Sequence, residues 1–251
     1  MFDSLSIFMS WEGWMYLFIL SVLEIVLGID NILFISIVTE DLAPTHRRKA
    51  RNIGLSIALI LRLVLLSIVS VLMQLKDPLF KILEIPFSSQ SLILVLGGLF
   101  LIYKSVDEMH KNINHEYASQ AIKRKGLSNI IGQIIVIDLI FSFDSIISAV
   151  GMTNGIGSET HSDPIAIIVF AIIISMFVMI AFAHQIAEFI SRHPTIKMIA
   201  LSFLVAVGIM LIAEAFGQQF PKGYIYFALA YALVVEMLNI QMRKNKLKKH
   251  G

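Results

Sequence analysis

Long apolar runs constrain this chain more than any other feature. Seven of them approach the length of a membrane-crossing helix, and short charged or Pro- and Gly-containing stretches separate them. About 20 apolar residues cross the roughly 30 Å hydrocarbon core as a helix, and no strand-like alternation suggests a barrel. The sequence predicts an all-α polytopic membrane protein with seven transmembrane helices, at about 13–38, 52–74, 90–106, 128–151, 164–189, 195–216 and 222–241.

Composition supports this class and excludes others. Hydrophobic residues make up 57% of the 251 residues and charged residues only 15%, against about 25% charged in soluble domains. The absence of cysteine excludes disulfides and thiolate metal sites. The first apolar segment lacks a preceding Lys or Arg, so we expect it to be retained and not cleaved as a signal peptide. Short connections predict a single membrane domain over residues 1–251.

Basic residues predict the orientation and argue against nucleic-acid binding. They gather in "THRRKAR", "KNINHEYASQAIKRKG", "SRHPTIK" and "RKNKLKKH", which follow the first, third, fifth and seventh spans. Juxtamembrane Lys and Arg stay on the cytoplasmic side. The chain is therefore expected to have its N-terminus outside and its C-terminus in the cytoplasm. These clusters flank the membrane and form no folded basic face, so nucleic acid is not an expected partner.

The first and fourth spans resemble each other. Placing "EIVLGIDNI" (24–32) over "DLIFSFDSI" (138–146) aligns acid with acid twice, with a small polar residue after each second acid. The third and sixth spans echo this pattern, since "VLGGLFLIYKSVDE" and "VAVGIMLIAEAFGQ" both carry glycine in an apolar run that ends in charge. Three spans are an odd number, so the second repeat enters the membrane from the other side. We predict a 3+3 inverted repeat, about 13–106 and 128–216, plus one extra helix at 222–241.

Helical spacing limits how the two acids of one span can act. Six residues separate Glu24 from Asp30, which is roughly 9 Å along a helix and about 240° around it. Glu24 and Asn31 nearly share a face, whereas Glu24 and Asp30 do not. In antiparallel first and fourth spans, Glu24 should lie level with Asp144, and Asp30 with Asp138. Local unwinding near Gly28 would let both acids point toward one site. The fourth span has Ser142 instead of glycine at the equivalent position, so unwinding is less supported there.

Charges inside the predicted spans need partners, because an ionised group at the bilayer centre is costly and usually functional. Away from the ends of the spans, the acids outnumber the single basic residue, Arg62. An excess of carboxylate oxygen suits a hard divalent cation such as Mn²⁺, Mg²⁺ or Ca²⁺. For any single acid, a helix-packing hydrogen bond or a pair with Arg62 competes with this interpretation. Arg62 neutralises one acid permanently or exchanges partners during transport, and Glu214 is either a gate or a solvated helix end. The predicted metal ligands are Glu24, Asp30, Asn31, Asp138, Asp144 and Ser145.

Enzymatic functions have little support. The contexts "LGIDN" and "FSFDS" do not resemble the glycine-flanked motif of intramembrane aspartyl proteases. No serine and histidine suggest a rhomboid-like dyad, and no Walker A motif is present. We expect no enzyme activity and no cofactor, and transport would run on ion or proton gradients.

Several segments together resemble the TerC family, in its short bacterial inner-membrane branch, and more distantly the LysE-type exporters. They are "EIVLGIDNILF", "LILRLVLL", "LILVLGGLFLIYKSVDEMH", "DLIFSFDSIISAVG", "RHPTIKMIALSFL" and "PKGYIYFALAYALVVEMLNI". The resemblance implies a seven-span protein of the bacterial inner membrane, a link to tellurium-resistance operons and, in several branches, manganese export. The C-terminal CBS domains of longer relatives are not expected here. The family's acidic motifs fall on Glu24, Asp30 and Asn31, and on Asp138, Asp144 and Ser145.

Three functional hypotheses follow. The first is a secondary transporter, an exporter of Mn²⁺ or a similar divalent cation, that uses a carboxylate site at the bilayer midplane. The alternative is a non-transporting membrane scaffold or assembly factor in which the acids are structural. A third and weaker hypothesis is export of an organic or oxyanion substrate, as in the LysE-type exporters. Tellurite itself is an anion that a carboxylate-lined site should repel, so any tellurium phenotype is expected to be indirect. The expected partners are the lipid bilayer and the divalent ion, and a homo-oligomer stays an open alternative.

Overall fold

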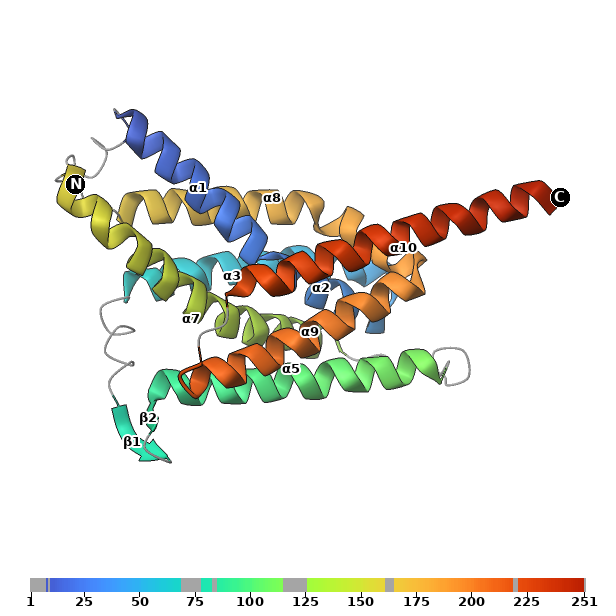
Figure 1. Cartoon of the computed structure of the whole chain (residues 1–251), viewed down its shortest axis with the longest axis horizontal. Coiled ribbons are helices and arrows are strands. Elements are labelled where there is room, and N and C mark those ends of the chain that lie inside the picture. The colour runs from blue at the N-terminus through green and yellow to red at the C-terminus, as the bar shows by residue number, and fades with distance from the viewer. Residues whose placement is uncertain are drawn as a thin grey trace. The chain divides into compact units, whose positions relative to one another are not determined.

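A computed structural model describes residues 8, 10–68, 78–82, 85–114, 126–160, 165–218 and 221–250. For residues 78–82, 85–86, 144, 147–160, 244 and 246–250, it describes the backbone and not the side chains. Nearly all of these described residues are helical (Figure 1). The prediction of an almost entirely helical chain is confirmed.

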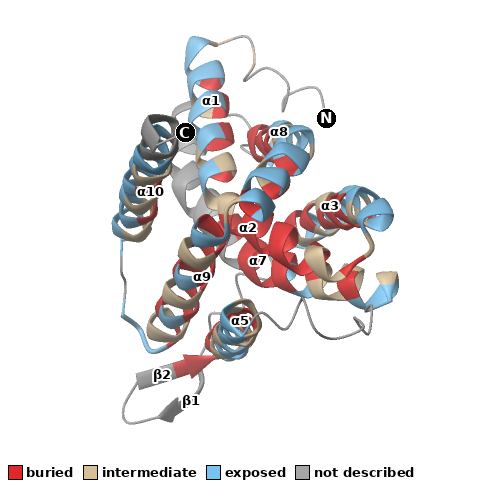
Figure 2. Ribbon diagram, turned by 90° about the vertical axis from the view of Figure 1, so that its right-hand side faces the viewer, coloured by how far each residue is buried: buried red, intermediate tan, exposed pale blue. Residues whose placement is uncertain are grey.

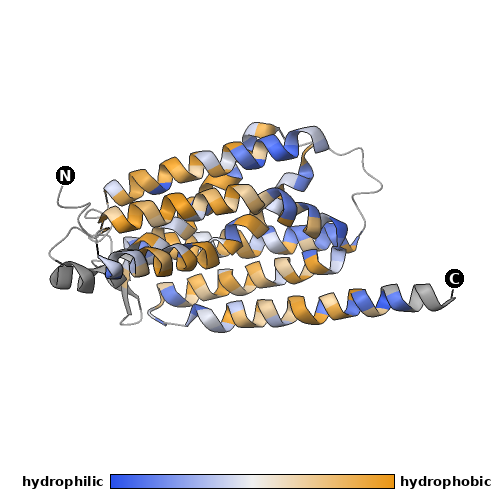
Figure 3. Ribbon diagram, turned by 90° about the horizontal axis from the view of Figure 1, so that it is seen from above, coloured by the Kyte–Doolittle hydropathy of each residue, from blue (hydrophilic) through white to orange (hydrophobic). Residues whose placement is uncertain are grey.

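Six helical segments among the described residues are long and apolar enough to cross a membrane. A shorter apolar helix, Leu127–Phe143, forms the first part of α7 (Leu127–Thr160). Each of these segments overlaps one predicted span, so a polytopic helical membrane protein is confirmed, and the count of seven spans stays a prediction. In Figure 3 the helix that ends at the C-terminus is orange along its first part and blue near its end. The six segments are Trp11–Asp41, Pro44–Ser67, Ser89–Ile113, Ile165–Arg192, Pro194–Ala215 and Lys222–Arg243.

The chain divides into two compact units, of which the first comprises residues 1–77 and 124–188. In this unit α7 packs against three other helices, α1, α2 and α3. Helix α2 is apolar on nearly all sides and is buried from Asp30 to Val38, as expected for a core helix (Figure 2). The elements of this unit are α1 (Trp11–Leu27), α2 (Ile29–Val38), the 3-10 turn Thr39–Asp41, α3 (Pro44–Ser67), α7 and all but the last turn of α8 (Ile165–Arg192).

Gly28 separates α1 from α2, at the point where the sequence predicts local unwinding. The interruption is a single residue, since the Gly28 amide still donates to Glu24 O and the Ile32 amide to Gly28 O. A Cβ at residue 28 would overlap the sulfur of Met179 in α8. The predicted unwinding is therefore limited to a break of one residue, where glycine allows close packing against Met179. Helix α7 is continuous at Ser142, the equivalent position of the fourth span.

The second unit comprises residues 78–123 and 189–251. It begins with an antiparallel hairpin of β1 (Pro78–Ile82) and β2 (Ile85–Ser88), which the sequence analysis did not predict. Ser88 and Ser91 then form a capping box that starts α5 (Ser89–Ile113). Helix α9 (Pro194–Ala215) is capped by Phe216 and followed by Gly217, whose positive φ of 79° is the left-handed conformation that glycine commonly adopts just after a helix. Helix α10 (Lys222–His250) follows and packs on α9.

Helices α5 and α9 approach each other most closely at two glycines. A Cβ at Gly208 would lie 2.9 Å from the carbonyl oxygen of Gly98 and 2.8 Å from the side chain of Ile102. A Cβ at Gly98 would overlap the carbonyl oxygen of Gly208 and the side chain of Ile212. The two backbones are therefore in direct contact, which only glycine permits at these positions.

The two units do not follow the order of the predicted repeats. The first unit contains the predicted first, second, fourth and fifth spans, and the second unit contains the third, sixth and seventh. Each unit therefore combines helices that come from both halves of the chain.

Candidate cation site in the first unit

Three helices of the first unit bring ionisable side chains together. Glu24 lies in the last turn of α1, Arg62 in α3 and Asp138 in α7, and all three side chains are at most 2% exposed. Arg62 Nη1 lies 3.0 Å from Glu24 Oε2, and Arg62 Nη2 lies 3.1 Å from Asp138 Oδ1. Of the two roles expected for Arg62, neutralising one acid or exchanging partners, neither predicts that the guanidinium contacts two acids at once, as it does here. Its planar, forked shape makes such a bridge possible.

Asp138 receives a full set of hydrogen bonds. Its Oδ1 accepts from Arg62 Nε at 3.4 Å, from Arg62 Nη2 at 3.1 Å and from Asn31 Nδ2 at 3.0 Å. Its Oδ2 accepts from Ser142 Oγ at 3.1 Å. Four donors from three helices therefore hold this carboxylate, which fixes its position between α2, α3 and α7.

Glu24 is held much less completely. Its Oε2 accepts one hydrogen bond from Arg62, and its Oε1 is buried without a hydrogen-bond partner among the described residues. Asn31 shows the same asymmetry, because its Nδ2 donates to Asp138 while its Oδ1 is buried and has no partner in the described part of the chain. Most buried polar atoms in proteins are satisfied. Two unsatisfied oxygens beside one ion cluster therefore make this cluster a candidate binding site.

The cluster also carries excess negative charge. Two carboxylates, Glu24 and Asp138, share the single guanidinium of Arg62. Asp30, the residue before Asn31 on α2, is 3% exposed and adds a further carboxylate to the interior of this unit. A further cation would balance the two carboxylates, Glu24 and Asp138, that share one guanidinium.

The predicted site residues have different outcomes. Glu24 and Asp138 both contact Arg62, and Asn31 joins the same cluster through Asp138, in line with the helix face that Glu24 and Asn31 nearly share. Ser145 is buried on α7, where its hydroxyl donates to the Ser142 carbonyl oxygen of the same helix. The side chain of Asp144 lies outside the described residues. That Asp144 lies level with Glu24 therefore stays a prediction. Glu214 is half-buried on α9 of the second unit.

Ser142 is the site residue that the sequence analysis missed. It was considered only as the counterpart of Gly28, whereas its hydroxyl donates to Asp138. Its position four residues after Asp138 was the available signal, because residues four apart share a helix face.

The described side chains contain no ready-made cage of carboxylates and histidines. No group of three or more such residues among them is close enough to hold a metal ion. Beside Glu24 and Asp138 lies the Arg62 guanidinium, which contacts both carboxylates. In the described arrangement, the cluster is thus balanced in part by a cation of the protein itself.

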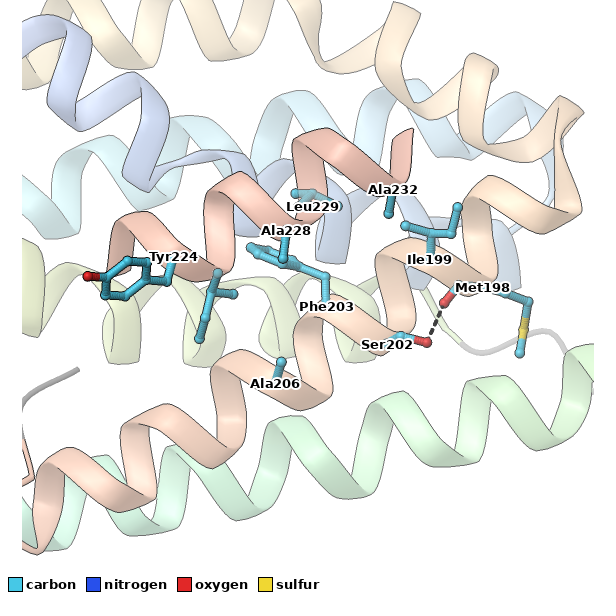
Figure 4. Close-up of a pocket in the computed structure, with 10 residues that line it drawn as sticks. Met198, Ile199, Ser202, Phe203, Ala206, Tyr224, Ala228, Leu229 and Ala232 are labelled. Carbon is cyan, nitrogen blue, oxygen red and sulfur yellow. Dashed lines mark hydrogen bonds between the residues drawn. The ribbon is translucent and has the colours of Figure 1, made fainter. Parts of the chain in front are cut away.

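A separate groove lies between α9 and α10 of the second unit and has a volume of about 490 Å³ (Figure 4). Its ten lining residues include no carboxylate, and the Ser202 hydroxyl is bonded to the Met198 carbonyl oxygen at 2.9 Å. Such an apolar lining offers no ligands for a divalent cation. The buried cluster of the first unit is the better candidate for a functional site.

Comparisons with known proteins agree with the membrane architecture. The model of the family described as "Integral membrane protein TerC family" matches residues 9–250. A UPF0053 protein of Haemophilus influenzae is 43% identical over 235 residues, which cover 93% of this chain and 95% of the relative. The UPF0053 inner membrane protein YgdQ of Escherichia coli K12 is 44% identical over 237 residues, which cover 94% of this chain and 96% of that protein.

A longer relative shares the same region. The UPF0053 inner membrane protein YoaE of Escherichia coli K12 is 40% identical over 236 residues, which cover 92% of this chain and 43% of that protein. No solved structure matches the chain. The family model spans every helix described above, from α1 to α10. The chain belongs to the TerC family of integral membrane proteins.

Proposed function

We propose that this protein is a secondary transporter that exports a divalent cation, with Mn²⁺ favoured, through the carboxylate cluster of the first unit. The observation that carries the proposal is the pair of buried, unsatisfied oxygens, Glu24 Oε1 and Asn31 Oδ1, beside the bridged Asp138. Carboxylate and amide oxygens are the ligands that Mn²⁺, Mg²⁺ and Ca²⁺ prefer. Protons return through the same carboxylates in this mechanism, and the chain has no enzyme activity.

Two further features favour transport. Ionisable residues buried inside membrane-spanning helices usually mark ion pathways. The cluster also adjoins a helix interruption at Gly28, and discontinuous helices are common at the substrate sites of secondary transporters. A purely structural acid would not need the helix interruption beside it.

The proposal includes seven spans in a 3+3 inverted repeat plus one helix. The repeat alignment pairs Gly98 with Gly208 and Ile102 with Ile212. The contacts around the two glycines follow this pairing, since Gly98 faces Ile212 and Gly208 faces Ile102. A two-fold axis between α5 and α9 would produce such exchanged contacts.

The proposed location is the bacterial inner membrane, with the N-terminus outside and the C-terminus in the cytoplasm. Two relatives, YgdQ and YoaE, are named as inner membrane proteins. The alternation of basic segments along the chain favours this orientation.

A non-transporting scaffold or assembly factor is the second candidate. It is favoured by the four donors that hold Asp138 and by the Arg62 bridge, which together form a self-contained ion cluster. In that case Glu24 and Asn31 would hold a structural ion or pair with another subunit.

The test is Mn²⁺ flux in proteoliposomes that contain the purified protein. Flux is expected for the intact protein and is expected to fall at least about tenfold in Glu24→Gln and in Asp30→Asn. Glu236→Gln is the matched control, because it removes a membrane acid from α10 of the second unit. Absence of flux for Mn²⁺, Mg²⁺ and Ca²⁺, or equal flux in all variants, would favour the scaffold.

A further inference from the structure

Arg62 occupies the place where a cation would complete the cluster, which suggests a role beyond charge balance. We propose that its guanidinium is a resident counter-cation, which the arriving divalent cation displaces from Glu24 while Asp138 retains it. This inference rests on the transport function proposed above and assigns different roles to the two carboxylates. Glu24 is the exchangeable ligand, and Asp138 is the anchor that positions Arg62.

The contacts of Arg62 are unequal in the direction that this exchange requires. Asp138 accepts two hydrogen bonds from the guanidinium, from Nε and from Nη2, whereas Glu24 accepts one, from Nη1. Asp138 is further fixed by Asn31 and Ser142. Breaking the Glu24 contact therefore costs one charge-assisted hydrogen bond, whereas leaving Asp138 costs two.

The oxygens that would receive the cation are already buried and unsatisfied. Glu24 Oε1 and Asn31 Oδ1 have no hydrogen-bond partner within the described residues, and both side chains are at most 2% exposed. Both residues reach the same cluster, Glu24 through Arg62 and Asn31 through Asp138. Ser21 lies one turn before Glu24 on the same side of α1, and its buried hydroxyl also lacks a described partner.

Exchange would explain why the cluster is stable without cargo. Two buried carboxylates without any cation would repel each other in a medium of low dielectric. The guanidinium holds them together in the unloaded protein, and its release from Glu24 makes room for one divalent ion. Arg62 would thereby oppose binding and lower the affinity to a level that permits release.

The experiment measures Mn²⁺ binding and the thermal midpoint of the full chain, purified in detergent, with MnCl₂ as the probe. Arg62→Met removes the competing charge, so it should bind Mn²⁺ about tenfold tighter than the intact protein, as expected for one charge-assisted hydrogen bond that no longer has to be broken. Its thermal midpoint without metal should fall, and Mn²⁺ should restore most of the loss. Arg62→Lys contacts one carboxylate at a time and should show a smaller gain in affinity.

Two controls make the result specific. Arg51→Met removes another buried arginine of α3, whose described contacts are Thr39 and His184, and should leave Mn²⁺ affinity unchanged. Arg62→Met combined with Glu24→Gln should lose the rescue by Mn²⁺, because the exchangeable ligand is gone. If Arg62→Met fails to fold, Arg62→Lys and the double variant carry the test.

The outcomes separate this inference from the proposed function. Mn²⁺ flux in the intact protein, with no gain in affinity in Arg62→Met or Arg62→Lys, would overturn the exchange and leave transport standing. No flux in the intact protein, together with no stabilisation of any Arg62 variant by Mn²⁺, would overturn both.

Discussion

The two units differ in the buried contacts that join their helices. In the first unit, Glu24, Arg62 and Asp138 bury three charges on three helices. In the second unit, Gly98 and Gly208 let the backbones of α5 and α9 touch with no side chain between them. A buried ion cluster is weak evidence for stability, because desolvation offsets much of the attraction. Close packing at glycines has no such cost. The second unit also buries an ion pair, Lys104 with Glu108, but this pair lies within the single helix α5, whereas Arg62 joins acids on two other helices of the first unit.

The largest effect is expected from Asp138→Asn. This change keeps the side-chain shape but removes the charge that Arg62 contacts twice, and it leaves a buried guanidinium with one carboxylate. Breaking a buried pair from one side costs about 3–5 kcal/mol. The thermal midpoint in detergent measures the loss, and Glu236→Gln provides the comparison in the second unit. An unchanged midpoint in Asp138→Asn would remove the anchor role of Asp138.

Alanine at either glycine of the α5–α9 contact is expected to cost about 1–3 kcal/mol, the usual range for overpacking. Because the contacts at Gly98 and Gly208 are exchanged copies of each other, the two variants should lose similar amounts of stability. Thermal unfolding at low and high salt is the measurement, and the loss should not depend on salt. A large difference between Gly98→Ala and Gly208→Ala would argue against a two-fold relation between α5 and α9.

Sequence patterns predict the helices and the buried acids, but not which side chains those acids contact. Apolar run length predicts each membrane helix, and the seven-residue spacing puts Glu24 and Asn31 on one face. Which face of α3 meets α7 depends on how the two helices rotate and pack. That packing includes Gly54, where a Cβ would lie 2.8 Å from the Ile134 side chain, and no spacing within one helix encodes it. The bridge from Arg62 to both acids was therefore not predictable, and neither was the short β1–β2 hairpin.

Gly28→Ala tests whether packing also shapes the charged unit. Alanine favours helix by about 1 kcal/mol over glycine, but its Cβ would overlap the sulfur of Met179. We expect a net loss near 1 kcal/mol, since methionine adapts easily. In a Met179→Ala background the overlap with the sulfur disappears, and the Glu24 carbonyl oxygen stays 3.0 Å from the Cβ position, so Gly28→Ala should cost less there than in the intact protein. A double-mutant cycle on thermal midpoints measures the coupling between the substitutions at Gly28 and Met179. Additive effects would contradict the close contact between these two residues.

The smallest expected effect separates two neighbouring serines of α7. Ser142 donates to the Asp138 carboxylate, whereas Ser145 donates to a backbone carbonyl of its own helix, and both are buried. A hydrogen bond to a charged group contributes about 1 kcal/mol more than one between neutral groups. Ser142→Ala should therefore lower stability by about that much more than Ser145→Ala, as read from thermal midpoints in detergent. Mn²⁺ flux also distinguishes the two serines. Ser145 is a predicted metal ligand, but its hydroxyl is already hydrogen-bonded within α7. If Ser145→Ala reduces flux while Ser142→Ala does not, the cation binds nearer to Ser145 than the Arg62 cluster indicates, and the site extends further along α7.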